Sequence, residues 1–194
     1  GVSWPILAAD LTVAWGRIAS GEPVQLPEVG TSFRRWMHGL ADLASTDDAA
    51  DRAHFWESVL EGPDPDLGSR PLDPALDLVE TVEEFRVVVP DDVTDAVLNR
   101  VPEAFHGSVD DSLLTALALA LVAWRAERGV DESTALVTLE GHGREEQLLP
   151  GADLSRTMGW FTSQYPVRLD VSGIDLDDAF AAGPELGRAV KAVK

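Results

Sequence analysis

The segment 109–128 constrains the fold most, because it is apolar on nearly every side between Leu113 and Trp124. A helix with such a sequence must be enclosed by protein on most of its circumference. Ser108 followed by Asp111 is the pattern of a capping box at its start. The apolar run is shorter than the roughly 20 residues that a membrane span needs. We therefore expect a core helix of a globular domain.

The rest of the chain alternates between helix-like and strand-like patterns. Apolar residues that recur every three or four positions indicate helices, and β-branched alternation indicates strands. These patterns predict helices over 5–18, 32–44, 47–60, 91–100 and from 175 onward, with strands over 81–89, 134–139 and 161–170. Prolines between Asp64 and Pro74 indicate an exposed connector. In the helix over 47–60 the side chains expected to face inward are those of Ala53, Trp56, Val59 and Leu60.

Charge and composition limit the classes of function that this protein can have. Thirty-four acidic residues against fifteen basic ones give a net charge of −19, which repels nucleic-acid phosphates and anionic lipid headgroups. We therefore expect neither nucleic acid nor a membrane as a partner. The sequence has no cysteine, which excludes disulfides, thiolate nucleophiles and Cys-ligated zinc. The lack of an export signal favours the cytoplasm, and both ends have the pattern of a piece cut from a longer chain.

The candidate site lies in residues 139–146, which read Leu-Glu-Gly-His-Gly-Arg-Glu-Glu after a strand-like run. Glu140 follows a hydrophobic element, where desolvation would raise the carboxyl pKa toward the range useful for proton transfer. Gly141 and Gly143 permit a left-handed bend and the close approach of a ligand to the backbone. The pattern predicts a proton-transfer site. The alternative is a plain surface loop in which Arg144 pairs with Glu140.

A metal site is a weaker interpretation of the same residues. Glu140 and His142 are too few ligands for a stable centre, and no second pair completes them. His38, His54 and His106 are scattered without ligand spacing. We predict no metal.

Three stretches carry a resemblance to a known family. They read Asp111-Ser-Leu-Leu-Thr-Ala-Leu-Ala-Leu-Ala-Leu, then Val137-Thr-Leu-Glu-Gly-His-Gly-Arg-Glu145, then Arg156-Thr-Met-Gly-Trp-Phe-Thr-Ser-Gln-Tyr-Pro-Val167. In this order they resemble the epimerization domain of nonribosomal peptide synthetases. The related condensation domains share the first stretch but usually lack the Glu-Gly-His-Gly-Arg signature and the Gly-Trp-Phe-Thr run.

The resemblance implies an α/β fold similar to chloramphenicol acetyltransferase, a two-lobed sandwich with a tunnel between the lobes, here incomplete. Residues 1–90 would be the end of the N-terminal lobe, and residues 91–194 the first part of the C-terminal lobe. Residues 1–7, Gly-Val-Ser-Trp-Pro-Ile-Leu, resemble only the end of the family motif His-His-x-x-x-Asp-Gly and the helix after it. We expect a domain truncated at both ends and a fragment that is inactive alone.

The same resemblance implies an amino-acid epimerase, which is an isomerase. Such an enzyme converts an L-aminoacyl or peptidyl thioester to the D-form by removing the α-proton and returning it from the opposite face. Glu140 is one of the two acid/base groups, and the second histidine of the missing motif is the other or stabilises the enolate. No cofactor is bound directly, because the substrate is carried on the phosphopantetheine of a carrier domain. The implied partners are a peptidyl carrier domain and adjacent adenylation and condensation domains.

Other residues of the resembling stretches have expected roles around Glu140. His142 supports Glu140 by hydrogen bonding or lines the tunnel, and the alternative is a structural turn histidine. Arg144 is expected to hold a carboxylate in place. For the remaining candidates core packing is the alternative. The residues expected to line the tunnel or the substrate are Ser3, Trp4, Trp160, Phe161 and Tyr165.

Two other function classes stay open on sequence grounds. A condensation-type acyl transferase would join two carrier-bound acyl groups without exchanging an α-proton. A non-catalytic module would only dock a carrier domain. Both would use a related fold, so the fold alone does not separate them.

Overall fold

The computed structural model describes residues 2–194, apart from the side chains of residues 47–51. By their contacts the residues form two compact units. Unit 1 comprises Gly1–Val59 and Thr138–Tyr165, and unit 2 comprises Leu60–Val137 and Pro166–Lys194. The lobe boundary predicted near residue 90 concerns a larger fold, and it stays a prediction.

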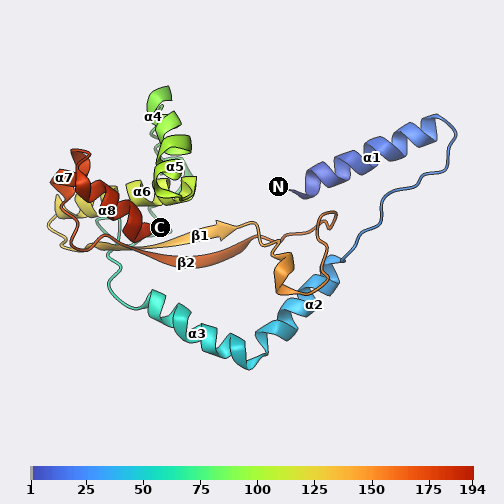
Figure 1. Cartoon of the computed structure of the whole chain (residues 1–194), viewed down its shortest axis with the longest axis horizontal. Helices are drawn as coiled ribbons and strands as arrows, with labels where there is room; N and C mark the ends of the chain where they lie inside the picture. The colour runs from blue at the N-terminus through green and yellow to red at the C-terminus, as the bar shows by residue number, and fades with distance from the viewer. Residues whose placement is uncertain (1) are drawn as a thin grey trace. The chain divides into compact units, whose positions relative to one another are not determined.

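The N-terminal part of the chain forms the three helices predicted for it. They are α1 (Ser3–Ala19), α2 (Phe33–Ala44) and α3 (Asp47–Leu60), shown in Figure 1. Ser32 caps α2, since its Oγ accepts a hydrogen bond from the Arg35 N–H at 3.2 Å. Trp36 of α2 is buried in unit 1.

Two of the predicted strands pair with each other. β1 (Thr134–Gly141) and β2 (Ser163–Asp170) form an antiparallel two-stranded sheet, as Figure 1 shows. Successive side chains along each strand point to opposite faces. The side chains of one face that pack against the core of unit 2 include Val137, Val167 and Leu169.

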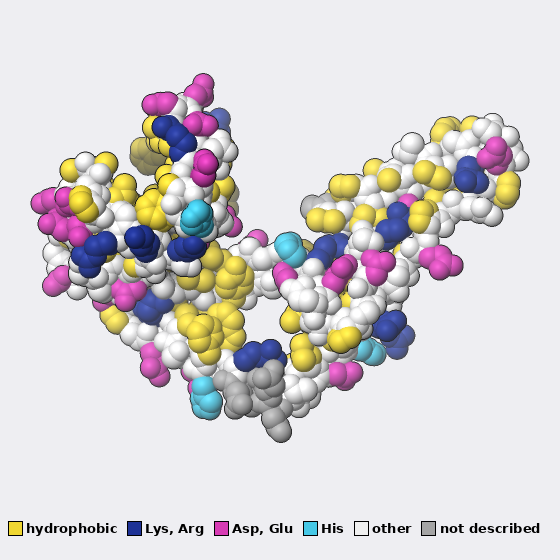
Figure 2. All heavy atoms as spheres, in the orientation of Figure 1, with side chains coloured by type: hydrophobic (Ala, Val, Ile, Leu, Met, Phe, Trp, Pro, Cys, Tyr) yellow, Lys and Arg dark blue, Asp and Glu magenta, His cyan; other side chains and the backbone are white. Residues whose placement is uncertain are grey.

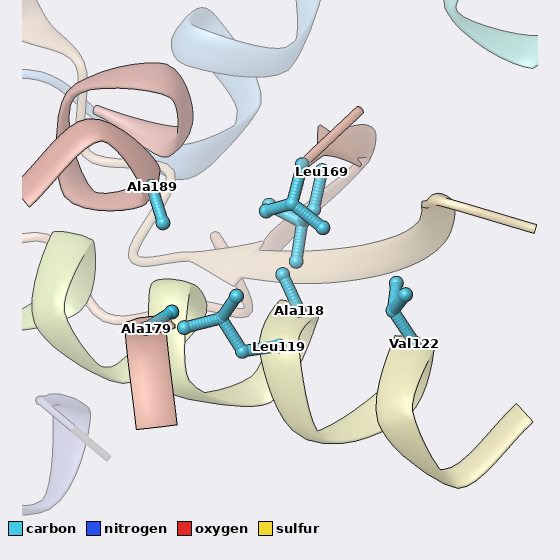
Figure 3. Close-up of a cluster of buried hydrophobic side chains, with 7 residues drawn as sticks. Ala118, Leu119, Val122, Leu169, Ala179 and Ala189 are labelled. Atoms are coloured by element: carbon cyan, nitrogen blue, oxygen red, sulfur yellow. The ribbon is translucent and has the colours of Figure 1, made fainter. Parts of the chain in front are cut away.

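The core of unit 2 forms where α6 (Val109–Ala126) packs beside this sheet. The predicted capping box is confirmed: Ser108 Oγ accepts from the Asp111 N–H at 3.1 Å, and Asp111 Oδ2 accepts from the Ser108 N–H at 2.6 Å. Small side chains let the elements approach closely. The buried side chains of this core are Ala118, Leu119, Val122, Leu169, Val171, Ala179 and Ala189 (Figure 3).

The connector after α3 is irregular, as predicted, and arginine side chains fasten its first residues within unit 2. The Arg125 side chain is 3% exposed and donates to the carbonyl oxygens of Thr134 at 2.6 Å and Pro65 at 3.2 Å. Arg168 donates to the carbonyl oxygen of Pro63 at 2.9 Å. These charge-assisted bonds join the connector to the start of β1.

The strand predicted over 81–89 is wrong for this structure. A strand needs a hydrogen-bonded neighbour, and within the described residues the sheet contains only β1 and β2. The segment after Val79–Thr81 is therefore irregular, with Phe85 and Val87 exposed by 91% and 85%. An alternating apolar pattern gives strand propensity, but it does not supply a partner.

Two predicted helices have different bounds in the structure. The helix predicted over 91–100 continues to Phe105 through α4 (Asp91–Asp95), a π-helical segment η2 (Ala96–Arg100) and α5 (Val101–Phe105). The helix predicted from Asp175 is two helices, α7 (Leu176–Phe180) and α8 (Pro184–Val193). The break falls at Ala182, whose φ of 58° is left-handed and ends a helix.

Two apolar faces that the sequence predicted to be enclosed are exposed. On α6, Leu113 and Leu117 lie one turn apart and are 53% and 42% exposed. On α3, Trp56 and Leu60 are 40% and 55% exposed. Figure 2 shows apolar side chains reaching the surface. Amphipathic periodicity identified these helices, but the sequence alone did not show which faces would be covered.

Among residues 2–194 no single helix combines the length and the apolar composition of a membrane span. Counted together, the described helical segments Asp91–Phe105 and Val109–Ala126 have that length and composition, but the pair is bent by 104° at the break between them.

Candidate functional site

Glu140 lies inside β1 rather than after it, because the strand extends to Gly141. Its Oε1 accepts a hydrogen bond from Gln164 Nε2 at 2.9 Å on the neighbouring strand. The side chain is exposed, so the burial predicted for it is wrong for this chain. A strand end lies at the rim of a sheet, where an outward-facing carboxylate meets water unless another part of the protein covers it.

The turn after β1 has a left-handed backbone conformation at only one of its two glycines. Gly143 has a φ of 66° and Gly141 does not have a positive φ, so the predicted left-handed bend is confirmed only at Gly143. A Cβ on Gly143 would lie 2.6 Å from the carbonyl carbon of Phe161 and still closer to its oxygen. The backbone that approaches this glycine is therefore that of the Gly-Trp-Phe-Thr run.

Among the described residues, Arg144 pairs neither with Glu140 nor with any other carboxylate. Its guanidinium donates to the carbonyl oxygens of Leu154 at 2.6 Å and Thr157 at 2.8 Å. It also lies over the Phe161 ring, 4.2 Å from the centroid. The Arg144 side chain thus joins the turn to residues 154–161. The two predictions for it, a pair with Glu140 and the positioning of a carboxylate, are wrong for this structure. A planar five-donor group suits two carbonyl oxygens and an aromatic face equally well, which the sequence pattern did not reveal.

His142 is a turn histidine in this structure. Its Nδ1 accepts a hydrogen bond from the Arg144 N–H at 2.9 Å. Since a backbone N–H only donates, Nδ1 must be unprotonated, and the ring proton of the neutral form sits on Nε2. That nitrogen lies 3.6 Å from Glu145 Oε1. Among the described side chains the hydrogen-bond partner of Glu140 is Gln164 and not His142.

Ser3 fastens the start of α1 to the Gly-Trp-Phe-Thr run. Its Oγ donates to the Gly159 carbonyl and accepts from the Gly159 N–H, both at 3.1 Å. Further along α1, Asp10 Oδ1 pairs with Arg156 Nη2 at 2.6 Å. The sequence analysis missed Asp10, although Arg156 opens one of the resembling stretches. Nothing in the spacing of the two residues shows that they meet.

These contacts bring three distant segments around one open pocket in unit 1, of about 620 Å³, within the range of small-molecule sites. Trp4 and Trp160 lie at its edge, 72% and 82% exposed. Indole rings at the rim of a pocket offer flat apolar surface to a ligand. The lining residues are Val2, Ser3, Trp4, His142, Arg144, Gly159, Trp160, Phe161 and Thr162.

Tyr165 and Glu140 lie outside this pocket. Tyr165 follows Gln164 on β2, so it points to the opposite face of the sheet from the Glu140–Gln164 pair. There its ring centroid is 6.4 Å from that of Trp56. Of the predicted lining residues, the structure brings together Ser3, Trp4, Trp160 and Phe161 but not Tyr165.

Hydrogen bonds fix the loop that carries the Arg144 partners. Asp153 Oδ1 accepts from the Ser155 Oγ–H at 2.6 Å and from the Ser155 N–H at 3.0 Å, which lowers the pKa of Asp153. The Asp153 backbone exchanges two hydrogen bonds with Thr31, at 2.9 and 3.0 Å. Within the described residues no three His, Asp or Glu side chains are grouped to hold a metal ion.

Comparison with known proteins identifies the family. A match to the condensation domain family covers residues 1–192, and the chain belongs to that family. It is 41% identical over 196 residues to chondramide synthase of Chondromyces crocatus, covering 97% of this chain and 5% of that protein. It is 34% identical over 173 residues to tyrocidine synthase 1 of Brevibacillus parabrevis, covering 88% of this chain and 15% of that protein. The chain thus spans a small part of the length of these relatives.

Two solved structures share the fold. The epimerization domain from the third module of tyrocidine synthetase B matches 99% of this chain and 40% of its own, with a TM-score of 0.65 and 28% identity. The first condensation domain of the CDA synthetase matches 100% of this chain and 38% of its own, with a TM-score of 0.59 and 21% identity. The mixed α/β architecture is therefore a part of the fold of condensation and epimerization domains. The complete two-lobed sandwich stays a prediction.

Proposed function

We propose that this chain is part of an epimerization domain of a nonribosomal peptide synthetase. The domain converts an L-aminoacyl or peptidyl thioester on a carrier domain to the D-form. A thioester carbonyl acidifies the neighbouring C–H because the carbanion charge delocalises onto oxygen, so one group removes the α-proton and another returns it from the opposite face. The substrate is held on phosphopantetheine, and the partners are a peptidyl carrier domain with adenylation and condensation domains beside it.

One observation carries the proposal: the two signatures that separate epimerization from condensation domains pack on each other. Gly143 of the Glu-Gly-His-Gly-Arg turn lies against the Phe161 backbone, and Arg144 stacks on the Phe161 ring. The reciprocal bond between Ser3 and Gly159 adds the segment that follows the histidine motif in the family. The packing of the turn on the run supports the assignment of this chain to the epimerizing branch.

Glu140 is the proposed acid/base residue on this chain. Among the described residues its carboxylate accepts one hydrogen bond, from Gln164 at 2.9 Å, which leaves the second carboxylate oxygen able to accept a proton. The proposal requires that in the complete domain this carboxylate faces the bound aminoacyl group. The second acid/base group is the histidine of the His-His-x-x-x-Asp-Gly motif. In this proposal His142 and Arg144 do not take part in proton transfer, and their role is to hold the turn after β1 in place.

The test loads a carrier with an L-aminoacyl thioester in heavy water and adds a domain completed with the His-His-x-x-x-Asp-Gly segment. Epimerization gives D-product with deuterium at the α-carbon. An unlabelled α-carbon in the L-configuration, next to a positive control with an active epimerization domain, contradicts the proposal. That unlabelled L-product is also the result expected for a non-catalytic module that only docks the carrier.

A condensation-type acyl transferase is the second candidate, favoured by the family match over residues 1–192 and by the likeness to a condensation domain. It predicts a new amide between a donor and an acceptor that are both carrier-bound. It also predicts no deuterium at the donor α-carbon. Supplying both carriers to the completed domain and measuring the peptide and the label separates the two activities in one reaction.

A further inference from the structure

Two indole rings contribute to the lining of the open pocket of about 620 Å³ in unit 1. Trp4 belongs to the start of α1, and Trp160 belongs to the Gly-Trp-Phe-Thr run. They are 72% and 82% exposed. Exposed indole rings at the border of one pocket are apolar surface that a ligand can cover.

Contacts within unit 1 hold the backbones of both tryptophans in place. Ser3 precedes Trp4 and exchanges two hydrogen bonds of 3.1 Å with Gly159. Gly159 in turn precedes Trp160, and a Cβ on this glycine would lie 2.8 Å from Phe33 Cε2, so the run also packs closely on α2. The two tryptophans are thus joined through their neighbours, and the pocket does not need to be formed by its ligand.

The polar side chains of this pocket are largely bonded to the protein itself. The two terminal nitrogens of Arg144 donate to the carbonyl oxygens of Leu154 and Thr157, and His142 Nδ1 accepts from the Arg144 N–H. Among the described residues that line the pocket there is no carboxylate. A charged ligand group would lose its hydration here while Arg144 has already given its donors to carbonyl groups, so the pocket favours an apolar ligand group.

Glu140 lies outside the pocket but close to it along the chain. His142 lines the pocket and is two residues from Glu140. Two residues of extended chain span at most about 7 Å, which limits the distance between the Cα atoms of Glu140 and His142. The pocket therefore begins about one large side chain away from the backbone of Glu140.

We propose that this pocket takes the side chain of the carrier-bound aminoacyl group and selects substrates with an aromatic side chain. The aminoacyl group beside Glu140 comes from the proposed function, on which this inference rests. Trp4 and Trp160 are the specificity-determining residues, because their indole rings pack on another aromatic ring by offset stacking or by edge contact. The proposed function alone leaves the amino acid open, since removal of the α-proton does not involve the side chain.

Binding is measured first on the chain alone and without turnover. NMR follows the indole Nε1–H signals during titration with the N-acetyl amides of L-phenylalanine, L-alanine and L-aspartic acid. The phenylalanine compound should shift the signals of Trp4 and Trp160 but not that of Trp15, which is 75% exposed on α1 and outside the pocket. It should bind about tenfold or more tightly than the alanine compound, because burial of an aromatic ring accounts for such a ratio. Equal affinities for the three compounds overturn the proposal.

Variants separate the pocket from exposed aromatic surface in general. Trp4→Ala and Trp160→Ala should each lower the ratio of phenylalanine to alanine affinity about threefold or more, and Trp160→Phe should keep most of it because an aromatic ring remains. The matched control Trp15→Ala removes a similarly exposed indole from α1 and should leave the ratio unchanged. A loss in the control equal to that in Trp160→Ala contradicts the proposal. Circular dichroism confirms that each variant is folded.

Turnover gives a second readout, in the completed domain with carriers that are loaded with L-phenylalanine, L-alanine or L-aspartate in heavy water. The kcat/KM for deuterium incorporation should be about tenfold or more higher for phenylalanine than for the other two, and Trp160→Ala should reduce this preference. Equal kcat/KM values for the three substrates overturn the assignment of the pocket while the proposed function stands. Absence of exchange with every substrate, with the binding preference intact, contradicts only the proposed function.

Discussion

Replacing Gly143 by alanine tests whether the signature turn and the Gly-Trp-Phe-Thr run form one structural feature. The alanine meets two costs. Its backbone must keep the φ of 66°, which is unfavourable by about 1–2 kcal/mol for a residue with a Cβ. Its methyl carbon would also lie 2.6 Å from the Phe161 carbonyl carbon, about 1 Å inside normal carbon–carbon contact.

Gly151 provides a matched control for the first cost. Its φ is 75°, and an added Cβ would meet no atom within 4 Å. Gly151→Ala should therefore lower the free energy of local opening by about 1 kcal/mol, after the smaller entropy of the unfolded alanine is counted. Gly143→Ala carries in addition a backbone clash that costs about 1–3 kcal/mol or more. We expect a total loss of about 2–5 kcal/mol.

The assay is native-state hydrogen exchange of residues 139–165, which reports local opening free energies. In Gly143→Ala the amides around Phe161 should exchange faster, because the Phe161 backbone must move away from the turn. Gly151→Ala should leave those amides nearly unchanged. If both variants are destabilised equally, the added methyl group meets no clash, and Gly143 does not pack against the Phe161 backbone.

Three other perturbations test the fold and the site. Ser3→Ala removes both hydrogen bonds to Gly159 and should lower the free energy of local opening by about 1–2 kcal/mol, which is measured as faster amide hydrogen exchange at Gly159. If the Gly159 amide is as well protected as in the parent chain, Ser3 does not hold this residue in place. Leu169→Ala empties a fully buried site and should cost about 2–5 kcal/mol in urea unfolding, whereas a cost below about 1 kcal/mol contradicts the described core. Hydrogen bonds from Ser155 lower the folded-state pKa of Asp153, so the stability they add is present above the unfolded pKa of about 3.9 and is lost as pH falls through the lower folded pKa. Asp153→Asn should therefore show a shallower loss of stability between about pH 5 and pH 2, and an unchanged slope disagrees with this pKa shift.

The elements with strong local signals were predictable from the sequence. The capping box of Ser108 and Asp111 and the apolar spacing of α1 and α2 depend on neighbours along the chain. The strand predicted over 81–89 failed because a strand needs a partner far along the chain. The prediction that Leu113 is enclosed failed for the same reason, since periodicity marks an apolar face but does not name what covers it.

The sequence predicted which residues belong to the site better than it predicted the contacts that these residues make. The resemblance predicted that Ser3, Trp160 and Arg144 lie around Glu140. The structure groups these three residues at one pocket, but Glu140 lies outside it. The partners of Arg144 were not predictable, because backbone carbonyls leave no trace in the sequence. The exposure of Glu140 was missed because a strand-like run was taken to bury the residue after it.

The central claim is that Glu140 moves the α-proton of a carrier-bound aminoacyl group, and deuterium exchange at that carbon tests it most directly. Glu140→Gln keeps an acceptor for Gln164 but removes the base. In the completed domain it should slow exchange by about 10²-fold or more, while Glu22→Gln, in the exposed loop after α1, leaves the rate unchanged. Exchange by Glu140→Gln at the parent rate contradicts the claim.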